Sequence, residues 1–184
     1  RSYSWRDRHR FDYTPADCMA FHDAIEEVVV PAAKRIYDRR RQMMGLDSLR
    51  PWDVDVDPTG LPALKPFSSV EELTQKAEAI FHHVDPVLGG YFSTMARENL
   101  LDLGNRKHKA PGAYSMDLPD IKRPFIFANA VGVHDDVATV LHESGHAFHY
   151  FESSRLPYYQ QVNPPMEFAE VGSMAMELLA APYL

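Results

Sequence analysis

Residues 142–146 have the types and the spacing to bind a metal ion and to act on a water molecule. His142 and His146 stand four positions apart, which places both imidazoles on one helix face, ~6 Å apart along the axis. Two imidazoles so placed can converge on one zinc ion through bonds of ~2.0–2.1 Å. Glu143 follows the first histidine directly, where its carboxylate can take a proton from water on the metal. The surrounding apolar residues predict a buried helix, which argues against a chance match on a histidine-rich helix.

A catalytic zinc site also needs a third protein ligand, and a second helical segment downstream offers one. This segment opens with two prolines at 164–165 and carries Glu167, Glu170 and Glu177 near one face. We assign Glu170 to the metal and interpret Glu167 as a first-turn helix acid. Glu177 lies two turns beyond Glu170, where it could accept a hydrogen bond from a ligand histidine. The alternative for Glu177 is a solvent-exposed helix face.

Several segments in this order resemble the thimet oligopeptidase and oligoendopeptidase F family of zinc metallopeptidases. The segments that carry the resemblance are 10–15, 109–115, 123–129, 135–137, 142–146 and 168–173. It is clearest from residue 97 to residue 177. The resemblance implies that His142, His146 and Glu170 bind one zinc ion per chain and that Glu143 is the general base.

The function that follows is hydrolysis of peptide bonds in short oligopeptides, because the family keeps its site in a deep channel that excludes folded proteins. Zinc would polarise the scissile carbonyl and lower the pKa of a water molecule, whose proton Glu143 would take. The first alternative is a non-catalytic peptide-binding module that keeps the fold, although the intact Glu143 favours an enzyme. The second is a structural zinc site, but such sites usually close with Cys or His.

The fold class that we predict is mainly α with a small β-sheet, a zincin-like catalytic core of a larger helical oligopeptidase. We divide the chain into a helical region, 1–104, and a metal-binding core, 105–184, and expect one continuous catalytic domain. In the family, a His and Tyr pair well beyond the third ligand stabilises charge on the intermediate. No such motif follows Glu177 here, so the sequence resembles an excerpt of a longer enzyme.

Composition sets further limits. The 184 residues are 45% hydrophobic with a formal net charge of −7 and no basic stripe, so we expect no nucleic-acid partner. No apolar run is long enough to span a membrane, and the single cysteine, Cys18, suits a reducing compartment. We therefore expect a cytoplasmic protein, although the missing initiator Met leaves room for a lost leader. The oligomeric state stays open.

Helix signals occupy most of the first hundred residues. A helix should begin after Thr14, bend near Pro31 and stop at Gly45. Its apolar stripe is predicted to be core, and it comprises Phe21, Ile25, Val28, Val29 and Ile36. A short surface strand is predicted near 52–56, a second helix from 68 to about 82, and a third from 85 to about 101.

Two apolar stretches, 113–116 and 125–128, predict strands of a small sheet beside the zinc helix. The resemblance implies that an edge strand at Gly112, Ala113 and Tyr114 pairs with an extended substrate backbone, with Gly112 allowing close approach. The alternative is an ordinary hairpin edge. His149 is too far along the helix from His142 to share its ion, so we expect it to line the cleft or to bond within the core. Tyr158 and Tyr159, in the loop between the two ligand helices, could pack there or face the substrate, and we expect them to pack.

Overall fold

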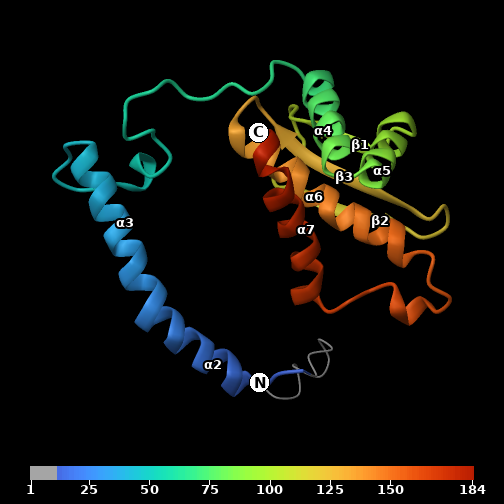
Figure 1. The fold of residues 1–184 in the computed structure, drawn as a ribbon, viewed down its shortest axis with the longest axis horizontal. Coiled ribbons are helices and arrows are strands. Elements are labelled where there is room, and N and C mark those ends of the chain that lie inside the picture. The colour runs from blue at the N-terminus through green and yellow to red at the C-terminus, as the bar shows by residue number, and fades with distance from the viewer. Residues whose placement is uncertain (1–11) are drawn as a thin grey trace. The chain divides into compact units, whose positions relative to one another are not determined.

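The computed structural model describes residues 12–184, so positions 10 and 11 of the family-like segment 10–15 lie outside the described residues. The chain is mainly helical with one three-stranded sheet, which confirms the predicted fold class (Figure 1). It divides into two compact units, 1–63 and 64–184. Each unit is described separately below.

A single run of helix dominates the first unit. It consists of α2 (Pro15–Ala24), a π-helical turn (Ile25–Val29) and α3 (Val30–Met43). Thr14 caps its start as predicted, through hydrogen bonds exchanged with Asp17, and Gly45 follows its end with a φ of +65°. The π turn stands just before Pro31, where the sequence predicted a bend. Proline lacks an N–H and displaces the carbonyl four residues back, and the wider turn accommodates both effects.

Two predictions for this unit are wrong. The apolar stripe is not core: Phe21, Val28 and Ile36 are each 65% exposed, because within the described residues of this unit no second layer covers the helix. The predicted strand at 52–56 is a 3₁₀ turn (Pro51–Asp53) followed by bends. Arg40 donates hydrogen bonds to the carbonyls of Asp53 and Val56, so side-chain contacts rather than a partner strand hold this segment.

The second unit begins its regular structure with two helices, α4 (Val70–Val84) and α5 (Pro86–Arg97). Ser69 and Asp85 cap their starts by accepting backbone N–H bonds, as the sequence indicates. The second of these helices ends four residues before the predicted position. The chain turns at Asn99, whose φ is +57°, and forms β1 (Leu101–Gly104), a strand that the sequence analysis missed.

Three strands form the sheet in the order β1-β3-β2 (Figure 1). The predicted stretches 113–116 and 125–128 correspond to β2 (Tyr114–Leu118) and β3 (Arg123–Ala130). The central strand β3 pairs parallel with β1 and antiparallel with β2. Pairing between β1 and β3 crosses the division that we placed at 104/105, and that one catalytic domain spans both parts stays a prediction.

A buried lysine ties the end of β1 to β3. The side chain of Lys109 is 1% exposed, and its Nζ lies 2.9 Å from the Asp102 carbonyl and 2.8 Å from the Gly104 carbonyl. It also donates to the Ala128 carbonyl and lies 3.0 Å from the Asp102 carboxylate. A buried ammonium needs such partners, and here they fix the loop that leads into β2.

The remaining elements carry the site. They are α6 (His134–Ser153), a 3₁₀ turn (Tyr159–Gln161), α7 (Met166–Ala180) and a last 3₁₀ turn (Ala181–Tyr183). Asp136 fixes the start of α6 by accepting the backbone N–H groups of residues 131–133 at 2.8–2.9 Å. The buried face of β3 and the core of α4 and α5 pack against α6, around Phe81, Phe92 and Leu141.

Over residues 12–184, no helix has both the length and the apolar character needed to cross a membrane.

Candidate active site

The two helices that carry the predicted ligands meet at a glycine. A Cβ added to Gly145 on α6 would lie 2.5 Å from the Ser173 Cα and 2.6 Å from the Gly172 carbonyl oxygen. Only a glycine allows this approach of the two backbones. The contact brings the first half of α7 over the histidines of α6, so that Glu170 can reach them.

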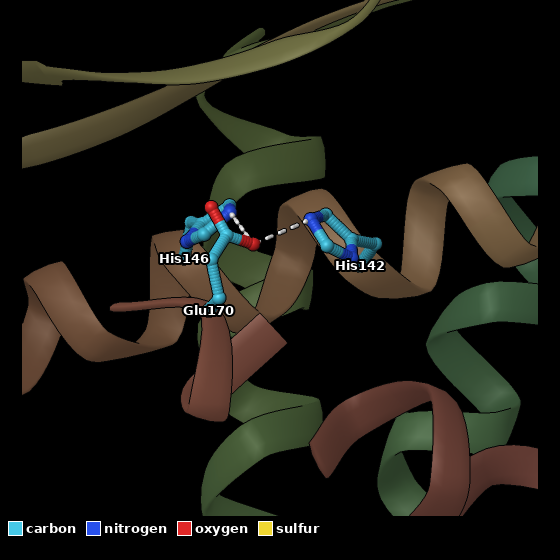
Figure 2. Close-up of side chains that lie close together, drawn as sticks. All are labelled: His142, His146 and Glu170. Carbon is cyan, nitrogen blue, oxygen red and sulfur yellow. Dashed lines mark ion pairs between the residues drawn. The ribbon is translucent and has the colours of Figure 1, made fainter. Parts of the chain in front are cut away.

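Three side chains predicted as metal ligands converge in the structure. The Oε2 atom of Glu170 lies 3.3 Å from the Nε2 atom of His142 and 3.6 Å from that of His146. Figure 2 shows the carboxylate between the two imidazoles, one helix contributing both rings and the other the acid. In a tetrahedral site with bonds of ~2.0–2.2 Å, neighbouring ligand atoms stand ~3.3–3.6 Å apart. The spacing and the two-nitrogen, one-oxygen donor set therefore fit a zinc ion.

Two neighbouring residues orient two of these three side chains, His142 and Glu170. The Oε1 atom of Glu177 lies 2.7 Å from His142 Nδ1, a distance at which the ring N–H donates to the carboxylate and Nε2 is left to face Glu170. Ser173, which is fully buried, donates to Glu170 Oε2 at 3.0 Å. Ser173 was not among the predicted site residues. Its signal was its place one turn after Glu170 on the same helix face.

Glu143 is a buried carboxylate beside the histidines. It is 8% exposed, and burial raises its pKa, to which the charge of Glu170 adds. The nearby His142 and a hydrogen bond donated by the Ser115 backbone N–H act in the opposite direction. Burial lowers the pKa of His146, which favours the neutral imidazole that a metal binds. The site thus holds a carboxylate whose basicity is increased next to imidazoles able to coordinate.

The predicted substrate strand lies at an edge of the sheet, next to Glu143. Since the Ser115 backbone contacts Glu143, it points away from β3. Gly112 precedes β2 with a φ of +96°, and its carbonyl accepts a hydrogen bond from Asn129. Ala113 packs against the core, and Tyr114 stacks on Phe127 with 4.9 Å between ring centroids.

Other predicted residues are not part of the convergent cluster. His149 lies at the contact between α6 and α7, with its Nδ1 3.8 Å from the position of a Cβ on Gly172. The prediction that Tyr158 and Tyr159 pack in their loop is wrong. They are 66% and 71% exposed, because the loop 154–165 has few apolar neighbours within the described residues.

Comparison with known proteins assigns this α+β fold to a family of peptidases. Residues 1–184 match the model of Peptidase family M3 over their whole length, so the chain belongs to that family. The predicted resemblance to oligoendopeptidases is thereby confirmed.

Relatives share this similarity over part of their own length. An oligoendopeptidase F homolog of Mycoplasma pneumoniae is 28% identical over 173 residues, which are 88% of this chain and 27% of the relative. Group B oligopeptidase PepB of Streptococcus agalactiae is 28% identical over 130 residues, 70% of this chain and 21% of the relative. The solved structure of PZ peptidase A with inhibitor 2 superposes with a TM-score of 0.91 at 30% identity, covering 97% of this chain and 32% of that one. The chain thus spans a third or less of these proteins.

Proposed function

We propose that the protein containing this chain is a zinc-dependent endopeptidase that hydrolyses peptide bonds in short oligopeptides. His142, His146 and Glu170 would hold the ion, and Glu143 would be the general base. The observation that carries the proposal is the position of the Glu170 carboxylate, 3.3 and 3.6 Å from the two imidazole nitrogens although it belongs to another helix. Membership of Peptidase family M3 supports it independently.

The bound zinc would supply a Lewis acid that polarises the scissile carbonyl and makes a water molecule acidic. Glu143 would remove a proton from that water as the water oxygen bonds to the carbonyl carbon. It would then pass the proton to the amide nitrogen of the scissile bond when the C–N bond breaks. The raised pKa of Glu143 suits a group that must both accept and return a proton. Ser115 would hold its carboxylate, and Glu177 would hold the His142 ring.

We infer that the substrate binds as an extended strand along the open edge of β2. That edge has backbone groups unused by β3, and it lies next to Glu143, as the Ser115 contact indicates. Backbone pairing gives affinity without side-chain selectivity, which suits an oligopeptidase. The restriction to short peptides rests on the family resemblance. The absence of a nucleic-acid partner and the cytoplasmic location stay predictions.

The test uses the full-length protein, a quenched fluorescent peptide and metal analysis. Glu143→Gln removes the base while keeping the size of the side chain. We expect it to retain zinc and to lower kcat/KM by at least ~10²-fold. Activity that is unchanged by this substitution would refute the assigned base. A wild-type protein that binds zinc and peptide but turns nothing over would favour the peptide-binding module.

A further inference from the structure

A cavity of about 280 Å³ lies between β2, α6 and the loop that follows α6. Strand β2 contributes Asp117 to its lining and α6 contributes Tyr150, while the loop after α6 adds Leu156, Tyr159 and Val162. Most of this wall is apolar, and Lys122 adds a cation from the turn after β2.

Asp117 is the acidic group of this cavity, and it is an exposed residue on β2. Among residues 12–184 its carboxylate has no hydrogen bond or salt bridge, and the Lys122 ammonium lies beyond ion-pair distance of it. Desolvation raises its pKa, and only the charge of His149 opposes this effect. The groups that face it from α6 are His149 and Tyr150. Because this carboxylate lines the cavity and is accessible and unpaired, a cation that enters the cavity can pair with it.

The position of Asp117 relative to the reacting group follows from strand geometry. Ser115, whose backbone contacts Glu143, is two residues earlier, so both side chains lie on one face of β2, ~6–7 Å apart along it. Asp117 is paired with Pro124, which has no N–H. The backbone N–H and C=O groups of Asp117 therefore point to the open edge of β2, as those of Ser115 do. An extended peptide with its scissile carbonyl at Glu143 would place a side chain about two residues away at the cavity.

We propose, on the basis of the proposed function, that this cavity is a subsite for a lysine or arginine side chain of the peptide substrate. The cationic head would pair with the Asp117 carboxylate. The aliphatic stem would lie against Leu156, Val162 and the ring of Tyr150, since long basic side chains bury their stems on apolar surface. The volume and the mixed wall suit such an amphipathic side chain better than a purely apolar one.

The test compares the full-length protein with its Asp117→Asn variant on matched quenched peptides. Each position within three residues of the cleaved bond carries Lys, Arg, norleucine or Glu in turn. We expect one position at which Lys and Arg raise kcat/KM about tenfold over norleucine, and we expect Asp117→Asn to remove this preference. The variant should cleave the Lys, Arg and norleucine peptides at similar rates, and its thermal unfolding midpoint, compared with that of the wild type, shows whether it folds. Asp120→Asn, in the neighbouring turn, is the matched control and should keep the preference.

A charge reversal separates recognition from a structural role. Asp117→Lys should shift the preference at that position from Lys to Glu, an effect that a merely loosened fold cannot produce. Cleavage without any preference that depends on Asp117 would overturn this inference while leaving the proposed function intact. So would a wild-type preference for Glu, which would assign recognition to Lys122. Failure of the wild type to cleave any peptide would instead defeat the proposed function.

Discussion

The orientation of His142 depends on a single carboxylate. The Oε1 atom of Glu177 lies 2.7 Å from His142 Nδ1. This hydrogen bond occupies Nδ1 and so leaves Nε2 to face Glu170. Glu177→Gln keeps an acceptor of similar size but removes the charge. We expect zinc affinity to fall ~10–100-fold, which competition with a chelator would measure in the full-length protein.

An exposed glutamate provides the control for this substitution. Glu71, in the first turn of α4, is exposed and distant in sequence from the site, so Glu71→Gln should leave zinc affinity unchanged. Equal affinities for the wild type and Glu177→Gln would mean that the contact does not orient the ring.

Much of the candidate site could be predicted from single residues, because histidines four apart and glutamates one and two turns apart obey fixed helical spacing. His142, His146, Glu170 and Glu177 were all singled out, and the structure brings them together. Ser173 was missed because a place one turn after Glu170 does not by itself distinguish a hydrogen-bonding serine from any other serine on that helix face. Asp117 was missed because the role proposed for it depends on the loop after α6, which lines the same cavity but is distant from β2 in the sequence.

At the scale of elements, the approach of α6 to α7 rests on Gly145. An added Cβ would lie 2.5 Å from backbone on the other helix, so Gly145→Ala must push the two helices apart. We expect a loss of about 1–3 kcal/mol in the free energy of unfolding and a loss of zinc binding, because Glu170 moves with α7. Chemical denaturation and metal titration would measure the two effects.

Gly90 offers a matched control within a helix. A Cβ there meets no atom within 4 Å, so Gly90→Ala should raise stability by up to ~1 kcal/mol through helix propensity alone. A Gly145→Ala variant that bound zinc normally would show that the helix contact does not position Glu170.

The stability of the fold at acidic pH should depend on the side chains that link β1 to β3. The hydrogen bond from Arg106, together with Lys109, lowers the pKa of Asp102 to about 2. The pKa of Asp102 is lower in the folded protein than in the unfolded chain. The interactions of its carboxylate with Arg106 and Lys109 therefore stabilise the fold above about pH 4, and this contribution disappears as the pH falls toward 2. We expect Asp102→Asn to lose about 1–2 kcal/mol at pH 7 and to show a flatter pH dependence between 4 and 2. Parallel pH curves for the two proteins would argue against this assignment.

The strand that Asp102 belongs to also shows the limit of local sequence patterns. A four-residue strand such as β1 carries too few residues to show a period, and its identity comes from pairing with β3. The longer helices α4 and α6 carry caps and several turns of apolar spacing, so their existence was predictable, and α4 differs from the prediction only at its ends.

At the scale of the whole molecule, the error about the helix at 14–44 has a physical cause. Its apolar stripe was predicted as core because a periodic stripe normally faces a second layer. Within the described residues of the first unit no layer covers it, and Phe21, Val28 and Ile36 are exposed. A sequence pattern shows that a face is apolar, but it does not show whether the covering residues belong to the same stretch of chain.

The second unit also exposes apolar side chains, and those on α7 are Met166, Phe168, Val171, Met174, Leu178 and Leu179. The chain spans about 32% of the PZ peptidase A structure that it superposes on, so we expect residues outside it to cover such faces in the longer protein. Exposed apolar patches larger than a few hundred Å² promote association. Residues 1–184 expressed alone should therefore self-associate and bind a hydrophobic dye more strongly than the full-length protein.

Surface substitutions can separate this effect from simple unfolding. Phe21→Gln, Val28→Gln and Ile36→Gln together should reduce self-association of the isolated chain, as measured by sedimentation. They should leave its helix content nearly unchanged, because none of the three side chains is buried there. The same substitutions should destabilise the full-length protein if those residues are covered in it. Equal stability of the substituted and unsubstituted full-length proteins would show that this face stays open to solvent in the longer chain.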